Sequence, residues 1–186
     1  IKVGKIPGQV VCVISDKSNP AVFDKAEQND IPTHYICRKQ FKEESEYDNF
    51  LLNILQKYDT DLIVLAGYLK LVPTPVVQEY KNAIINIHPA LLPKFGGKGY
   101  YGSKVHEAVL EAGEEESGAT VHFVDEIYDN GLIIKQEKVE VKPDDTPHEL
   151  AERVLKVEHK IFPEVVKAFC EDRIKIKKDG VSIEHE

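Results

Sequence analysis

Residues 83–89 read Ala-Ile-Ile-Asn-Ile-His-Pro, and this stretch decides the fold of the chain. Its apolar beginning, Ala83-Ile84-Ile85, is typical of a buried strand. Asn86 and His88 follow two residues apart, so their side chains point to the same face of that strand. Pro89 cannot donate a ladder hydrogen bond, and the strand is expected to end there. The stretch predicts either one edge of an active site or a polar strand end that is capped only by water.

Apolar runs and helical patterns alternate through the first half of the chain. The run 62–66 has five apolar residues in a row, which predicts a strand covered on both faces. The alternation favours an α/β fold: an open, mostly parallel sheet with helices on both faces. The expected elements are a strand over 10–15, a helix over 20–28, strands over 31–36 and 62–66, helices over 47–58 and 74–80, and the strand from 83.

The second half begins with a glycine-rich loop and then returns to regular patterns. A long helix ends at about Phe169, and Pro163 inside it predicts a kink or a split. The remaining expected elements are a helix over 103–112, strands over 120–124 and 132–141, and a terminal hairpin formed by 174–176 and 181–183.

Size and charge limit the classes of function. The 186 residues suit a single domain, and no apolar run approaches the roughly 20 residues of a membrane-spanning helix. A net charge of -8 argues against nucleic acid or an anionic membrane as a partner. The three cysteines lack metal-ligand spacing and fit reduced thiols in the cytoplasm. No signal segment is recognised, and the absence of methionine at position 1 predicts a chain that begins part-way into its gene product.

Asp129 is a third polar residue that could act with Asn86 and His88. The sequence Asp129-Asn130-Gly131 also suits a plain turn, so the residues alone leave both interpretations open. Together the three side chains fit acyl transfer to an amine. An amide donates to the oxyanion, an imidazole moves the proton, and a carboxylate orients the imidazole. No Gly-x-Ser-x-Gly elbow or phosphate-binding Gly-x-x-x-x-Gly-Lys-Ser/Thr motif is present.

Two further polar residues, Thr120 and His122, share one face of an expected strand. A histidine within Thr-Val-His-Phe-Val is more often a core residue, or one that supports a catalyst, than a catalyst itself. His106 lies in an expected helix without a partner at ligand spacing, and it is interpreted as structural. The sequence predicts no metal site.

The motifs, taken together, resemble those of the folate-dependent formyltransferases, and the resemblance runs from about Val10 to the C-terminus. The matching segments are Asn86-Ile-His-Pro-Ala-Leu-Leu-Pro93, Gly118-Ala-Thr-Val-His-Phe-Val124, Asp129-x-Gly131, Leu65-Ala-Gly-Tyr-Leu69 and Val157-Glu-His-Lys-Ile-Phe-Pro163.

The resemblance implies a role for each matching residue. Asn86 would hold the formyl oxygen, His88 would be the general acid and base, and Asp129 would pair with His88. Thr120 would lie near an ordered water, with His122 beside it, and Glu158 and Leu155 would contact the ribonucleotide. Besides Asn86, the residues implied to line the folate pocket are Leu69, Lys70, Leu71, Val72, Val124, Asp125, Glu126, Ile127 and Tyr128.

The resemblance also implies the activity and the architecture. The co-substrate would be 10-formyltetrahydrofolate, and the acceptor would be the amine of 5-phosphoribosylglycinamide, without a metal. The fold would be one Rossmann-like domain over 1–186, with a nucleotide-binding half over about 1–88 and a folate-binding half over about 89–186. The family's first strand would be missing, and the protein would be a monomer or a homodimer. The alternatives are a hydrolase that deformylates the folate and a non-catalytic folate-binding fragment.

Overall fold

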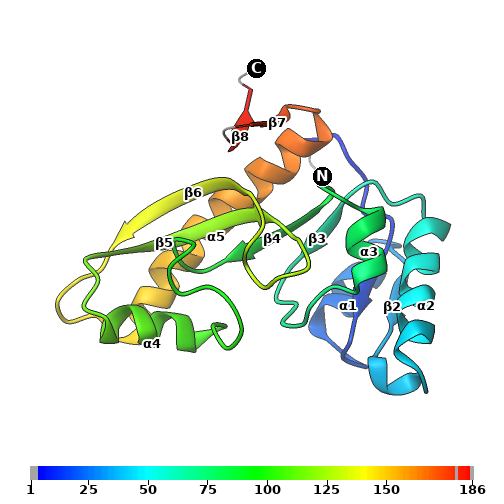
Figure 1. The fold of residues 1–186 in the computed structure, drawn as a ribbon, viewed down its shortest axis with the longest axis horizontal. Coiled ribbons are helices and arrows are strands. Elements are labelled where there is room, and N and C mark those ends of the chain that lie inside the picture. The colour runs from blue at the N-terminus through cyan, green and yellow to red at the C-terminus, as the bar shows by residue number, and fades with distance from the viewer. Residues whose placement is uncertain (1–3, 179, 185–186) are drawn as a thin grey trace.

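The computed structural model of the chain describes residues 4–178 and 180–184, with helices and strands that alternate along most of the chain (Figure 1). The elements are β1 (Val13–Ser15), α1 (Ala21–Glu27), β2 (Thr33–Tyr35), the 3₁₀ turn η1 (Arg38–Gln40), α2 (Glu44–Lys57), β3 (Ile63–Leu65), α3 (Thr74–Glu79), β4 (Ile84–His88), α4 (Ser103–Glu111), β5 (Glu116–Phe123), β6 (Ile133–Glu140), α5 (Pro147–Cys170), β7 (Ile174–Lys177) and β8 (Gly180–Ile183).

The largest sheet has the strand order β3-β4-β5-β6. Its β3–β4 pair is parallel, whereas β5 runs antiparallel to both of its neighbours. Strands β1 and β2 form a separate parallel pair, and β7 and β8 form the expected terminal hairpin. The open α/β sheet predicted from the sequence is confirmed, and it is mixed rather than uniformly parallel.

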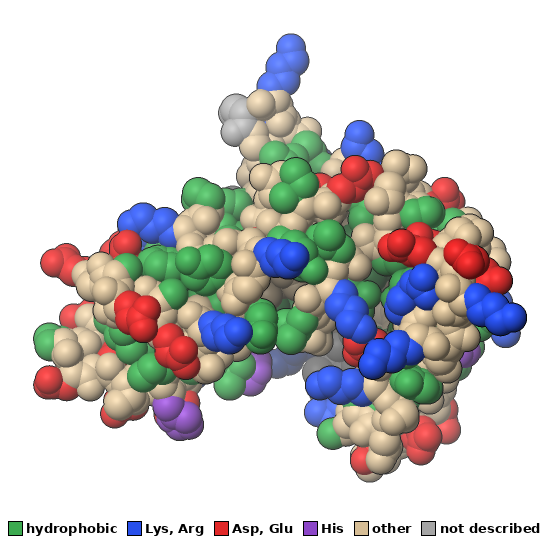
Figure 2. Space-filling model, turned by 60° about the horizontal axis from the view of Figure 1, so that its bottom comes forward, with side chains coloured by type: hydrophobic (Ala, Val, Ile, Leu, Met, Phe, Trp, Pro, Cys, Tyr) green, Lys and Arg blue, Asp and Glu red, His purple; other side chains and the backbone are tan. Residues whose placement is uncertain are grey.

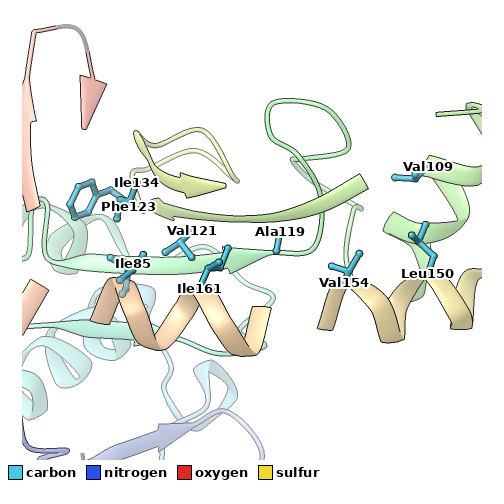
Figure 3. Close-up of a cluster of buried hydrophobic side chains, with 10 residues drawn as sticks. Ile85, Val109, Ala119, Val121, Phe123, Ile134, Leu150, Val154 and Ile161 are labelled. Atoms are coloured by element: carbon cyan, nitrogen blue, oxygen red, sulfur yellow. The ribbon is translucent and has the colours of Figure 1, made fainter. Parts of the chain in front are cut away.

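Strand β4 is covered on both faces because successive side chains of a strand point to opposite sides. Ile85 belongs to a core cluster with residues of β5 and α5, and Figure 3 shows it beside Val121 and Ile161. Ile84 belongs to a second cluster with residues of α2 and α3. Both isoleucines have 0% exposure. Asn86 and His88 continue the Ile84 face, which is the face opposite α5.

Helix α5 begins at a capping box and continues through Pro163. Thr146 Oγ1 accepts from the Glu149 amide, and the Glu149 carboxylate accepts from the Thr146 amide. The sequence predicted a kink or a split at Pro163, and the split is wrong because α5 is one continuous helix. An interior proline costs about 3 kcal/mol, but each buried valine or isoleucine contributes about 1.5–3 kcal/mol. Fully buried side chains, Ile161 and Val165, lie on both sides of the proline.

Strand β3 departs from the expectation that it is covered on both faces. Val64 remains 42% exposed. The reason is that β3 is the edge of its sheet: it pairs with β4, and within the described residues the β1–β2 pair does not join its other edge. None of the described helices is both long and apolar enough to cross a membrane.

Truncating Leu150 to alanine is expected to lower the free energy of unfolding by about 2–5 kcal/mol, because the buried cavity cannot fully collapse. Leu150 is fully buried, whereas Leu155 on the same helix is 46% exposed. The matched control Leu155→Ala should therefore cost about 1 kcal/mol or less. Urea unfolding of both variants measures the difference, and equal losses would contradict the assigned packing of α5.

Candidate active site

The antiparallel register between β4 and β5 assembles the polar face of the site. Asn86 lies opposite His122, and His88 lies opposite Thr120. Residues directly opposite each other in such a pair share a face. The two polar side chains at the end of β4 therefore meet two more on β5. His88 and His122 are almost completely buried, at 4% and 2% exposure.

Asp129 reaches this face from the loop between β5 and β6. One carboxylate oxygen lies 3.6 Å from His88 Nδ1, and the other lies 3.6 Å from His122 Nε2. The Gly97 amide donates to the same carboxylate at 2.9 Å. The structure thus brings Asn86, His88 and Asp129 together, and His122 contacts both Asn86 and Asp129.

The loop that carries Asp129 is also a tight turn, so the two interpretations of Asp129-Asn130-Gly131 do not exclude each other. Asp129 has a left-handed backbone with φ 52°. The backbone of Gly131 packs directly against β5, and a Cβ atom at this position would lie 1.9 Å from the Phe123 carbonyl oxygen. Only glycine tolerates that approach. The turn itself therefore aims the carboxylate at the histidines.

The hydrogen bonds fix the protons on His88. Its Nε2 donates to the Phe95 carbonyl oxygen at 2.7 Å, since a carbonyl can only accept. In the neutral ring, Nδ1 therefore carries the lone pair and faces Asp129. Phe95 itself has φ 55°, a left-handed conformation that costs a non-glycine residue about 1–2 kcal/mol. A strained backbone residue thus supplies the acceptor that sets the tautomer.

His122 orients Asn86 by the same reasoning. The Nδ1 of His122 donates to the Phe123 carbonyl oxygen at 2.7 Å. In the neutral ring, Nε2 is then an acceptor for the Asn86 amide nitrogen, 3.2 Å away. That nitrogen carries two hydrogens, and the second stays available to donate to a ligand oxygen.

Burial and charge oppose each other at His88. Burial lowers the pKa of His88, while the Asp129 carboxylate and the Phe95 carbonyl favour the charged ring and offset only part of that effect. The ring is therefore neutral at pH 7 and can accept a proton. Burial alone would raise the pKa of Asp129, but the His122 and His88 rings, which favour the carboxylate when they are charged, and the Gly97 amide outweigh it and hold the pKa below its usual range.

Thr120 is fully buried, and its hydroxyl group is saturated. It donates to the Ala90 carbonyl at 2.6 Å and accepts from the Leu92 amide at 3.1 Å and from Gln136 Nε2 at 2.8 Å. A hydroxyl has one hydrogen to donate and two lone pairs. The hydroxyl is thus fully engaged within the protein, and it fixes the chain that follows His88.

Two loops implied to bind folate expose large apolar side chains. Leu69, Leu71 and Ile127 are 59%, 44% and 62% exposed. Other members of the set have structural partners. Lys70 pairs with Asp16 at 2.6 Å, and Val72 is buried in the second core cluster.

The acidic members of the 124–128 loop stabilise the loop itself. Asp125 accepts from the Ile127 amide and from Asn130, each at 2.8 Å, and Glu126 accepts from Gln78 of α3 at 3.2 Å. Val124 packs against the second core cluster, and Tyr128 is half-buried. The most exposed apolar side chain of this loop is therefore that of Ile127.

Glu158 and Leu155 lie on α5, which packs on the opposite face of the sheet from Asn86. Burial raises the pKa of the Glu158 carboxyl. Among the residues that the structure describes, the hydrogen bonds and ion pairs of Asn86, His88 and Asp129 do not extend to Glu158 or Leu155.

The surface is hollowed between the part that carries α4 and the part that carries α1 and α2, and lysine and arginine side chains gather beside the hollow (Figure 2). In a chain with a net charge of -8, such a local cluster can still attract an anionic ligand. Within residues 4–178 and 180–184, no group of three or more His, Cys, Asp or Glu side chains could hold a metal ion.

Sequence reasoning missed three partners of the site: the Phe95 carbonyl, the Gly97 amide and the Gln136 side chain. The first two are backbone groups, which carry no signal in the residue type. Gln136 lies at an alternating position of β6, where a polar residue is ordinary on an exposed strand face.

Comparisons with known proteins identify the family and agree with the fold. Residues 1–166 match the formyl transferase family, and the chain belongs to that family. The chain is 49% identical over 182 residues to the chloroplastic phosphoribosylglycinamide formyltransferase of Arabidopsis thaliana. That match covers 97% of this chain but only 62% of the plant protein.

Solved structures share the architecture. Glycinamide ribonucleotide transformylase 1 from Symbiobacterium toebii superposes with a TM-score of 0.90 at 36% identity, over 99% of this chain and 84% of that one. A formyltetrahydrofolate deformylase from Pseudomonas syringae pv. tomato has a TM-score of 0.83 at 27% identity, over 95% of this chain and 57% of that one.

Replacing Asp129 with asparagine is expected to lower the pKa of His88 further, because the carboxylate that favours the charged ring is removed while its shape is kept. An NMR titration of the imidazole signals measures this shift. The control Asp125→Asn changes a carboxylate of the same loop that binds Ile127 and Asn130. A His88 pKa that is unchanged or raised in Asp129→Asn would contradict the described geometry.

Proposed function

We propose that the protein transfers a formyl group from 10-formyltetrahydrofolate to the amine of 5-phosphoribosylglycinamide, a step of purine biosynthesis. The observation that carries this proposal is the convergence of Asn86, His88 and Asp129 in a chain of the formyl transferase family. The names of the Arabidopsis and Symbiobacterium relatives support the choice of acceptor.

The site supplies the groups that a direct attack by the amine requires. The free N–H of Asn86 stabilises the oxyanion that forms when the amine adds to the formyl carbon. His88 accepts the amine proton at Nδ1, the nitrogen left unprotonated by the Phe95 contact, and returns a proton to the leaving folate nitrogen. Asp129 faces Nδ1 and stabilises the charged ring between these transfers.

The folate ring system would lie against the loops at 69–72 and 124–128. The exposed side chains of Leu69, Leu71 and Ile127 offer apolar surface for a flat ring. The backbone of these loops would supply the directional contacts, since Val72, Asp125 and Glu126 are already engaged within the protein.

The ribonucleotide is proposed to bind through residues and charges outside the catalytic cluster. Glu158 and Leu155 are proposed to contact this substrate, in keeping with a nucleotide-binding half over about 1–88 and a folate-binding half over about 89–186. The basic side chains beside the hollow of Figure 2 suit the substrate phosphate. A monomer or homodimer acting in the cytoplasm stays a prediction, and the plant relative is chloroplastic.

A deformylase is the second candidate, supported by the fold shared with the Pseudomonas enzyme. In that reaction His88 would activate a water molecule in place of the amine. Release of tetrahydrofolate, followed by absorbance with and without the ribonucleotide, separates the two reactions. Release that depends on the ribonucleotide identifies the transferase, and release that proceeds equally without the ribonucleotide identifies the hydrolase. Folate binding without turnover would identify the non-catalytic fragment.

Asn86→Ala and His88→Ala are each expected to lower kcat by about two to four orders of magnitude, since one removes the oxyanion donor and the other the acid and base. Matched controls are Asn53→Ala and His148→Ala, which truncate exposed residues of α2 and α5. Steady-state kinetics measures the loss. Rates within twofold of the unmodified protein in either site variant would exclude the proposed mechanism.

A further inference from the structure

A row of three polar side chains crosses the sheet beside the catalytic candidates. His88 of β4 lies opposite Thr120 of β5, and Thr120 lies opposite Gln136 of β6. Antiparallel partners share a face, so all three point to the side that carries Asn86. Gln136 is the member of this row that the proposed reaction does not use.

Both amide hydrogens of Gln136 are engaged. Nε2 donates to the Leu92 carbonyl at 2.9 Å and to Thr120 Oγ1 at 2.8 Å. Thr120 in turn holds the Ala90 carbonyl and the Leu92 amide. Gln136 and Thr120 together fix both polar groups of the Leu92 backbone, and they tie the chain after His88 to β5 and β6.

The segment fixed in this way leads directly to the catalytic side chains. Phe95 follows Leu92 by three residues, and its carbonyl holds Nε2 of His88 at 2.7 Å. Gly97 follows, and its amide holds Asp129 at 2.9 Å. Phe95 also keeps a left-handed backbone with φ 55°, which a loosely held chain would relax.

We propose that Gln136 is a positioning residue for the formyl transfer: together with Thr120 it holds residues 90–97 so that the Phe95 carbonyl keeps His88 in its Nε2–H tautomer, with Nδ1 facing Asp129. The proposal rests on the proposed function for its kinetic consequences. Its structural core, the tautomer of His88, can be tested without turnover.

The groups that face His88 determine the direction of the accompanying pH effect. Asp129 and the Phe95 carbonyl favour the charged ring, whereas burial and the nearby His122 disfavour it. His106 of α4 is buried and also close enough to His88 to feel its charge. Losing the Phe95 contact removes one of the two favourable groups, so the pKa of His88 is expected to fall further.

The first experiment compares Gln136→Met with the unmodified protein and with Lys138→Met. Methionine keeps the length of glutamine but cannot donate. Lys138 lies two residues along the same face of β6 and pairs with Glu116 on the surface. Long-range ¹H–¹⁵N spectra of the imidazoles report the tautomers. The unmodified protein and Lys138→Met should show the Nε2–H form of His88, and Gln136→Met should show a mixture with the Nδ1–H form.

The second experiment measures formyl transfer in the same proteins. Misplacement of the acid and base by a fraction of an ångström should lower kcat of Gln136→Met about 10- to 100-fold. Both KM values should stay within about threefold, because Gln136 touches neither proposed substrate. The acidic limb of the kcat/KM profile should move to lower pH.

Thr120 provides a matched pair of variants in case Gln136→Met does not fold. Thr120→Ser retains the hydroxyl and should behave as the unmodified protein. Thr120→Val keeps the shape, loses the hydroxyl, and should reproduce the tautomer mixture and the lower kcat. Equal behaviour of the serine and valine variants would overturn the proposal.

The two proposals fail in different ways. If the unmodified protein transfers no formyl group, the proposed function fails, and the imidazole spectra still decide whether Gln136 positions His88. If the unmodified protein is active and Gln136→Met keeps both the single tautomer and a kcat within twofold of Lys138→Met, the positioning role is overturned.

Discussion

The register of β4 on β5 is the constraint on which the rest of the site depends. It sets Asn86 opposite His122 and His88 opposite Thr120, on the face away from α5. The intervening pairs, Ile85 with Phe123 and Ile87 with Val121, bury their side chains against α5. A slip of one residue would exchange the two faces, placing histidines in the apolar core and isoleucines at the site. Burial of the apolar core therefore holds the polar face in register.

The site combines strand and loop residues whose constraints reinforce one another. Gly131 lets the β5–β6 loop lie against Phe123, and the resulting turn aims Asp129 at both histidines. The segment after β4 bends back, and its Phe95 carbonyl and Gly97 amide meet His88 and Asp129. The Nε2–H of His88 and the Asp129 carboxylate each have a hydrogen-bond partner in this segment, whereas a buried polar group left without one would cost about 1–3 kcal/mol.

The electrostatic balance at His88 follows from this enclosure. Burial in the sheet makes the charged ring unfavourable, while Asp129 and Phe95 make it accessible. A general acid and base benefits from that balance, because it must hold a proton and also release it. The exposed side chains of Leu69, Leu71 and Ile127 offer an apolar surface to a ligand.

The sequence by itself determined the order of helices and strands and the common face of Asn86 and His88, because both follow from local periodicity. It left Asp129 open between a turn and a catalyst, and it gave no sign that the Thr120 hydroxyl is bound to the chain after His88. The exposure of Val64, the Phe95 acceptor and the Gln136 anchor were decided only by the tertiary structure. The physical reason is that they depend on strand pairing, backbone direction and contacts between distant segments, none of which residue types specify locally.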